Sequence, residues 1–384
     1  MGVRRTRSRE LAQIDRRVLG RSEPADPLEV VAAEGSVVTD ERGRTYVDFA
    51  AGWCCGNLGW ARPEIRARLA QFRGPDYVSP SLMYAPWVEL AARLIEVAPG
   101  ELARCYRAVG GTEAVEIAIQ IARAATGREK LIKIEDGYHG NSIGVQAIRG
   151  RVRPPLGERA LARLETALKK RDVAAFIMEP IVLNLGVEIP TAEFMTGAQA
   201  LCRRYGTLFI LDEVATGFGR TGAMFATEHY DVEPDILCLA KAITGGHAPM
   251  AATLVTDEVA RAATDFELYS TFGWHPLAVE AALANLDVWR DHGDELLGNI
   301  CERSDQFATR LAAMDRIERV RIAGLAIGVV LEADDADRVV ARCREDGLLV
   351  TGEEDTLELF PALTIDRATA DHGLDVLARA LRSR

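Results

Sequence analysis

The chain has 384 residues, of which 48% are hydrophobic, and a formal net charge of −11. A chain of this length can bury a large core, and we expect one large domain and a smaller one. The acidic balance argues against nucleic acid and anionic membranes as partners, because both attract basic surfaces. No apolar run approaches the roughly 20 residues that a membrane-spanning helix needs.

The seven cysteines are odd in number and scattered, which is typical of a protein of the reducing cytoplasm. Neither they nor the six histidines show a pair at metal-ligand spacing, so we predict no metal site. The first 23 residues are rich in arginine but precede no apolar segment, unlike a secretory signal. We expect them to form a solvated arm that docks on a partner subunit.

Strand-like runs flank residues 40–43, which predicts a small antiparallel hairpin. The loop 51–59 that follows is rich in aromatic and sulfur-containing side chains, including Trp53 and Cys54. Loops of this kind often line pockets, although Trp and Cys are also commonly buried for packing alone. We place Trp53 and Cys54 in a candidate substrate pocket.

Helical spacing recurs at 63–72 and 87–97. At 110–113 the run Gly-Gly-Thr-Glu predicts the start of another helix, because glycines precede a Thr and an acidic first turn. Such a helix end offers free N–H donors and the positive end of the helix dipole, which suit a phosphate. Most helix N-termini bind nothing, so this run alone predicts little.

From about residue 105 to 255, strands alternate with helices, which predicts a mostly parallel sheet covered by helices. Two short runs are rich in Leu and Ile. The first ends in Asp212, the second is followed by one Ala and then Lys241, and glycines come after both charged residues. Runs of this length suit buried parallel strands. Chemistry in open α/β sheets sits at the carboxyl ends of strands, so both side chains should project into one crevice.

Lys241 differs from the other lysines, at 130, 133, 169 and 170, because those sit beside other charges. It lies among apolar and small residues, where poor hydration favours the neutral amine that can form a Schiff base. A snorkelling surface lysine or a buried ion pair would fit the same position. Position alone does not separate these interpretations.

Residues 277–290 have helical spacing, and the remainder of the chain indicates a smaller α+β unit. We therefore expect an N-terminal arm with a small-domain segment, a large domain and a C-terminal small domain, at 1–50, 51–290 and 291–384. The glycines at 217–222 match the dinucleotide pattern G-x-G-x-x-G, but they come after the sheet has begun and after two acidic residues. This context excludes a nicotinamide dehydrogenase.

Six short blocks occur in an order and spacing that chance does not readily produce. They are Gly110-Gly111-Thr112-Glu113-Ala114, Tyr138-His139-Gly140, Glu179-Pro180, Asp212-Glu213-Val214-x-Thr216-Gly217-Phe218-Gly219-Arg220-Thr221-Gly222, Lys241 and Ser270-Thr271. Together they resemble the class III (ω-type) aminotransferases, over nearly the whole chain. The resemblance implies an α/β fold of type I, pyridoxal 5'-phosphate as cofactor, and a homodimer.

By this resemblance, Lys241 forms the Schiff base with the cofactor and, once released by substrate, moves the α-proton as a general base. Asp212 pairs with the pyridinium nitrogen, which keeps the ring an electron sink. Val214 and Tyr138 should lie against opposite faces of the ring.

The resemblance also assigns the cofactor phosphate to Gly111 and Thr112, which offer N–H and hydroxyl donors. Thr271 matches the residue that reaches the phosphate from the partner subunit, which implies active sites shared across the dimer. His139 and Glu179 belong near the cofactor, and for both a purely structural role stays open.

Departures from the family pattern bear on the substrate. Ala215 replaces a common Gln, and Asn184 replaces a Glu that in several members pairs with a substrate-binding arginine. Glu358 stands where that arginine is expected, so an α-carboxylate held there is not expected and a cationic substrate is our hypothesis. Trp274 replaces a usual glycine and is expected to narrow the pocket.

We predict a ping-pong transfer of an amino group from an amine or amino acid donor to a keto or aldehyde acceptor. A racemase, aminomutase or decarboxylase on the same scaffold would use Lys241 and Asp212 equally. A non-catalytic binding protein is a further alternative. It is disfavoured because Lys241, Asp212 and Thr271 are all present, and a binding protein needs no electron sink.

Overall fold

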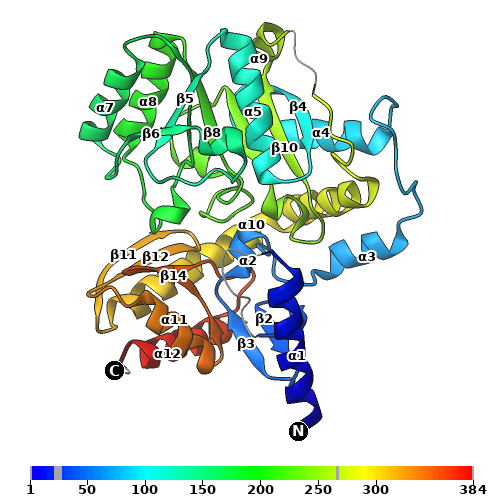
Figure 1. Ribbon diagram of the computed structural model, residues 1–384, viewed down its shortest axis with the longest axis vertical. Coiled ribbons are helices and arrows are strands. Elements are labelled where there is room, and N and C mark those ends of the chain that lie inside the picture. The colour runs from blue at the N-terminus through cyan, green and yellow to red at the C-terminus, as the bar shows by residue number, and fades with distance from the viewer. Residues whose placement is uncertain (1, 21–27, 265–267, 383–384) are drawn as a thin grey trace.

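The computed structural model describes residues 2–20, 28–264 and 268–382. Figure 1 shows a large sheet with its helices in the upper half of the molecule, and the N- and C-terminal segments together in the lower half. In the described ranges, no helix has both the length and the apolar character needed to cross a bilayer.

The large sheet has seven strands in the order β4-β10-β9-β8-β7-β5-β6. Strand β10 is antiparallel to its neighbours β4 and β9, whereas the pairs from β9 to β6 are parallel, as the sequence predicts. The strands are β4 (Leu102–Ala108), β5 (Lys130–Ile134), β6 (Arg149–Val152), β7 (Val173–Met178), β8 (Leu208–Asp212), β9 (Ile236–Leu239) and β10 (Ala251–Thr256).

Burial explains the apolar runs of this sheet. Every residue of β7 is buried, because helices cover both faces and leave no side for polar side chains. Helix α5 packs its apolar face on the middle of the sheet and ends at Gly127, whose φ of 65° is the left-handed conformation that closes many helices. The helices of this part are α3 (Pro63–Gln71), α4 (Ala85–Val97), α5 (Gly111–Thr126), α6 (Ile143–Gln146), α7 (Glu158–Leu168), α8 (Ala192–Tyr205) and α9 (Asp257–Ala262).

The two ends of the chain share a second sheet. Strands β2 and β3 form the antiparallel hairpin predicted around residues 40–43, and β13 from the C-terminal part pairs parallel with β3. A third, antiparallel sheet has the order β11-β12-β15-β14. The elements are α1 (Gly2–Val18), β1 (Val30–Glu34), β2 (Val37–Asp40), β3 (Thr45–Asp48), α2 (Ala51–Cys54), β11 (Ile317–Ala323), β12 (Ala326–Leu331), α11 (Ala336–Glu345), β13 (Leu348–Leu349), β14 (Thr351–Glu353), β15 (Thr356–Leu359) and α12 (Arg367–Arg382).

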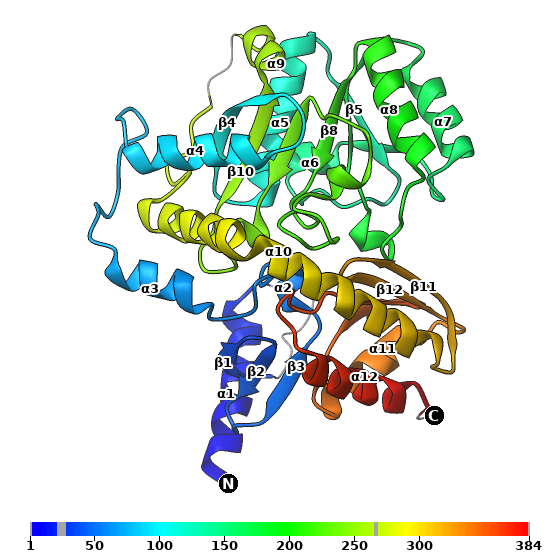
Figure 2. The same ribbon diagram turned by 180° about the vertical axis from the view of Figure 1, so that it is seen from behind.

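Helix α10 (Pro276–Ala312) joins the two halves of the molecule. It continues for 22 residues beyond the end of the helix predicted at 277–290. The run Asp-His-Gly at 291–293 interrupts the apolar pattern, but Leu296, Ile300 and Phe307 continue the buried face. Figure 2 shows α10 passing from the large sheet to the C-terminal sheet. The domain boundary expected near residue 290 therefore falls inside one continuous helix.

Candidate active site

Predicted site residues gather at one edge of the large sheet. Asp212 ends β8, Glu179 follows β7 directly, and Lys241 follows β9 after one residue. Because β7, β8 and β9 are adjacent and parallel, their carboxyl ends share this edge. His139 reaches the same place from the loop after β5.

Asp212 is held by two hydrogen bonds. One carboxylate oxygen, Oδ1, accepts from the Val214 N–H at 3.0 Å, and Oδ2 lies 2.7 Å from His139 Nδ1. Asp212 and His139 are 3% and 4% exposed, and His139 Nε2 has no partner among the described residues. His139 therefore orients the carboxylate, and the pair forms a fixed, buried acceptor site.

The N-terminus of α5 forms a cradle beside this carboxylate. Gly110 precedes the helix and supplies no side-chain cap, so the first-turn N–H groups stay available to an anion. A Cβ on Gly111 would lie 2.9 Å from Val214 Cγ1, so only glycine fits there. A Cβ on Gly140 would lie 2.6 Å from Thr112 Oγ1, which brings the loop after β5 against the same turn.

Lys241 begins the short 3-10 helix η3 (Lys241–Thr244) with a φ of 45°, a strained value for a residue with a Cβ. It is half-buried, and its amine has no hydrogen bond or ion pair with any described residue. Asn285 of α10 stabilises this turn, because its amide donates to the carbonyls of Ala242 and Ile243 at 3.0 and 3.2 Å. The signal for this role in the sequence is a polar Asn within an apolar stretch, and it lies outside the six blocks that carry the family resemblance.

Glu213 follows Asp212 but has a different environment. It is fully buried, and its carboxylate accepts from Thr216 Oγ1, the Ala226 N–H, and both the N–H and hydroxyl of Thr227. The two Thr227 bonds are each 2.7 Å long. Burial raises the pKa of Glu213. Its contacts fix the loop between β8 and the helix η2 (Ala226–His229), so its role is structural.

Arg220 occupies the centre of the glycine-rich loop and is fully buried. Its guanidinium donates to the carbonyls of Leu325 and Pro361 at 2.8 and 2.7 Å, and to Asn57 Oδ1 at 2.7 Å. The loop that matches a dinucleotide pattern by letters thus ties the large sheet to the C-terminal part. Sequence reasoning did not single out Arg220 or Asn57, because their partners are more than 100 residues away.

Tyr138 is 58% exposed, which leaves its ring free to cover a bound molecule. Asn184 fixes its backbone: the Tyr138 N–H donates to Asn184 Oδ1 at 3.1 Å, and Asn184 Nδ2 donates to the Asp136 carbonyl at 2.9 Å. The residue that departs from the family pattern therefore holds a loop of the site instead of pairing with an arginine.

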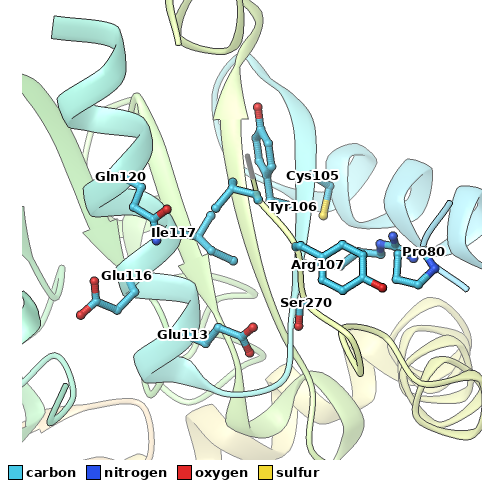
Figure 3. A pocket seen from close by; sticks show the side chains of 11 residues that line it. Pro80, Cys105, Tyr106, Arg107, Glu113, Glu116, Ile117, Gln120 and Ser270 are labelled. Carbon is cyan, nitrogen blue, oxygen red and sulfur yellow. The ribbon is translucent and has the colours of Figure 1, made fainter. Parts of the chain in front are cut away.

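Thr271 is exposed on the surface of the single chain. Its neighbour Ser270 lines a cavity of about 320 Å³ together with Arg107 and Glu113, between β4 and the start of α5 (Figure 3). The guanidinium of Arg107 stacks over the Trp87 ring at 3.8 Å.

Trp274 is 1% exposed, and its indole N–H donates to the Ala251 carbonyl at 2.8 Å. Its own carbonyl accepts from the Trp87 indole at 2.6 Å. The structure thus gives Trp274 a packing role in the core and not the open, pocket-narrowing face expected from the sequence.

Trp53, Cys54 and Glu358 lie where the two halves of the molecule meet. Trp53 is 51% exposed, and its ring centre lies 6.3 Å from that of Phe360. Cys54 is buried, which raises the pKa of its thiol, whereas the charges of Arg220 and Lys241 lower it. Burial also raises the pKa of Glu358 to about 7, against smaller opposing effects that include a hydrogen bond from the Gly186 N–H.

The raised pKa of Glu358 predicts a pH-dependent effect of Glu358→Gln on the apoprotein. The Glu358 carboxyl keeps its proton up to about pH 7 in the folded chain, but only up to about pH 4.5 in the unfolded chain. Protonation of Glu358 therefore stabilises the fold at low pH, and this stabilisation is lost as the pH rises from 4.5 through 7. We expect Glu358→Gln to raise the free energy of unfolding at pH 8 by up to about 3 kcal/mol, with the gain vanishing near pH 4.5. Urea unfolding of both proteins at pH 8 and at pH 4.5 measures this change in the free energy of unfolding.

The exposed Glu353 on β14 provides the matched control, and Glu353→Gln should change the free energy of unfolding by no more than about 0.5 kcal/mol at either pH. An equal effect of the two variants would show that burial of Glu358 carries no charge penalty.

The donor set fits pyridoxal phosphate. The start of α5 suits the phosphate, the fixed Asp212 carboxylate suits a protonated ring nitrogen, and the unpaired Lys241 amine suits the aldehyde. Two buried polar atoms, His139 Nε2 and Glu179 Oε1, lack partners among the described residues, as expected where a polar group is to bind.

Comparison with known proteins agrees with this geometry. The model of the aminotransferase class-III family matches residues 19–154 and 145–381. An acetylornithine aminotransferase of Methanopyrus kandleri is 37% identical over 93% of this chain and 95% of its own length. A Bacillus anthracis aminotransferase structure superposes with a TM-score of 0.90 at 27% identity, covering 99% of both chains.

A taurine:2-oxoglutarate aminotransferase from Bifidobacterium kashiwanohense, in complex with PLP and glutamate, gives a TM-score of 0.90 at 26% identity, over 97% of both chains. These likenesses confirm the α/β fold of type I that the sequence predicts. The chain therefore belongs to the class III aminotransferases, enzymes that transfer amino groups with pyridoxal phosphate.

Proposed function

We propose that Lys241 binds the aldehyde of pyridoxal phosphate and then carries the α-proton of the donor on its amine nitrogen, Nζ. The bound cofactor supplies an electron sink for the carbon that loses this proton. The observation that carries the proposal is the convergence of Lys241 and Asp212 at the carboxyl ends of adjacent strands. The free amine and the strained turn of Lys241 support it further.

Asp212 and His139 would hold the ring nitrogen. The carboxylate is anionic in this role, and its bond to His139 Nδ1 fixes the direction in which it accepts. Because both side chains are buried, the attraction between carboxylate and protonated ring is screened by little water. Val214 lies beside Gly111 and would press on one ring face, and the exposed Tyr138 would cover the other.

The N–H groups of Gly111 and Thr112 would bind the phosphate, with a further hydroxyl from Thr271 of the partner subunit. A homodimer is supported by apolar side chains left open on the single chain: Met83 is 88%, Ile143 is 91% and Tyr269 is 70% exposed. All seven cysteines are free thiols, which supports the cytoplasm as the compartment.

An absorbance experiment tests amino transfer directly. The protein loaded with pyridoxal phosphate is mixed with an amino donor alone, and its spectrum is followed until the aldehyde form is replaced by the pyridoxamine form. Addition of a keto acid should restore the first spectrum and yield a new amino acid. Loss of optical activity of the donor without any keto product would instead identify a racemase.

Thr271→Ala is expected to weaken retention of pyridoxal phosphate about 10-fold, because one hydrogen bond to a charged phosphate is lost. Equilibrium dialysis of the loaded protein measures this change. The control is Thr166→Ala on the exposed face of α7, which should retain the cofactor like the unaltered protein.

Mixed dimers show whether Thr271 acts across the subunit interface. A dimer of one Lys241→Ala and one Thr271→Ala subunit has one intact site if the hydroxyl comes from the partner, and none if it comes from the same chain. Normal cofactor retention at half of the sites is therefore expected. Weakened retention at every site would contradict the shared arrangement.

A further inference from the structure

Two buried carboxylates face the Lys241 region from opposite halves of the molecule. Glu179 follows β7 and is 5% exposed, and Glu358 lies on β15 and is 8% exposed. Within the described ranges, no Lys, Arg or His nitrogen lies within 4.0 Å of either carboxylate. Glu179 Oε1 moreover has no hydrogen-bond partner in that part of the chain. Buried carboxylates normally have a cation or several donors beside them.

The charge of Lys241 acts on both carboxylates, but Lys241 cannot serve as their permanent counter-ion. A lysine that attacks an aldehyde or accepts a proton must be neutral when it does so. The carboxylates therefore lack a cation at the stage when the donor binds, unless the donor brings one.

Glu358 is held in place before any ligand arrives. Its carboxylate accepts from the Gly186 N–H, and Arg321 fixes that residue by donating to the Gly186 carbonyl at 3.0 Å. Arg321 also lies 3.3 Å from the Glu188 carboxylate, which anchors the loop after Glu179 to β11. One backbone donor leaves most of the acceptor capacity of Glu358 unused.

Apolar residues close in sequence to both acids form one buried cluster. Cys54, Ile181 and Phe360 belong to one small buried cluster between the two halves, with Ala215 packed against it. Such walls suit a hydrocarbon spacer, and the low dielectric strengthens any ion pair formed at its end.

We propose that Glu358, assisted by the unpartnered carboxyl oxygen of Glu179, binds a second cationic group of the amino donor. Diamines and donors with a positively charged tail are then preferred to donors with a neutral tail of the same size. This inference rests on the proposed function, because the donor's reacting amine must reach Lys241 while its other end reaches Glu358.

Two amino donors of equal length test the proposal. The far end of 1,4-diaminobutane carries an ammonium group, whereas the far end of 1-aminopentane carries a methyl group. The first half-reaction of the loaded enzyme is followed by stopped-flow absorbance, and kcat/KM is obtained for each donor. In the unaltered enzyme the diamine should be preferred. Glu358→Gln should reduce this preference about 10- to 100-fold, chiefly through KM, because a charge-assisted hydrogen bond is lost.

Glu353→Gln is the matched control, since it removes one negative charge from the neighbouring strand β14 and should leave the preference unchanged at pH 8, where Glu358 is ionised in both proteins. If both donors are converted and the ratio of their kcat/KM values is the same in the unaltered enzyme and in Glu358→Gln, the cation site is overturned and amino transfer stands. If neither these donors nor any amino acid produced the pyridoxamine form, the proposed function itself would fail, and the cation site with it.

The pH dependence of the same ratio gives an independent readout. The groups that face Glu358 are Glu353 from β14, Lys241 from η3, Glu179 after β7 and the Cys54 thiol from α2. Ionisation of Glu358 near pH 7 strengthens the attraction, so the preference for the diamine should rise between pH 6 and 8. In Glu358→Gln the ratio should stay flat, because effects common to both donors cancel. A parallel rise in the variant would contradict the assignment.

Discussion

Lys241→Ala should lower kcat for amino transfer by about 10⁴-fold or more, because it removes both the nucleophile for the cofactor aldehyde and the base that moves the α-proton. The covalent adduct of pyridoxal phosphate with the chain, which borohydride reduction makes permanent, should disappear. The fold should persist, since no described hydrogen bond or ion pair depends on this amine. The strained φ of 45° also suits Ala no worse than Lys.

Mass spectrometry of the reduced protein locates the adduct. Lys130→Ala is the control, because Lys130 is an exposed lysine that pairs with Asp172 on the surface. This variant should keep the adduct and the activity. A reduced adduct on any other lysine in Lys241→Ala would refute the assignment, whether or not activity falls.

The sequence predicted the site well where chemistry follows local pattern. Buried parallel strands appear as continuous apolar runs, so the ends of β8 and β9 and the residues beside them could be located. Asp212 and Lys241 stand out because each is a charge that follows such a run. The lone position of Lys241 among apolar residues corresponds in the structure to an unpaired amine.

Long-range packing could not be predicted in the same way. Arg220 bonds to carbonyls 105 and 141 residues away, and no local pattern announces such partners. Trp274 was expected to narrow the pocket because it replaces a usual glycine, but its N–H donates to the Ala251 carbonyl and the ring stays in the core. The Asp-His-Gly run at 291–293 interrupts the apolar pattern and concealed the continuity of α10, which tertiary packing maintains.

The adjacent acids Asp212 and Glu213 allow one comparison to separate catalysis from stability. Asp212→Asn should lower kcat about 10²- to 10³-fold, because a neutral amide no longer stabilises the protonated ring nitrogen. The fold should change little: the Asn carbonyl can accept from the Val214 N–H, and His139 Nδ1 can accept from the Asn amide in its other tautomer.

Glu213→Gln should show the opposite pattern, with kcat close to that of the unaltered enzyme and the free energy of unfolding reduced by about 1–3 kcal/mol. The amide NH₂ cannot accept, so one of the buried N–H donors of Ala226 and Thr227 is left without a partner. Steady-state kinetics gives kcat, and urea unfolding gives the free energy of unfolding, for each of the two variants. Equal losses of kcat in the two variants would mean that β8 is disturbed as a whole. In that case the charge of Asp212 would have no separate role in catalysis.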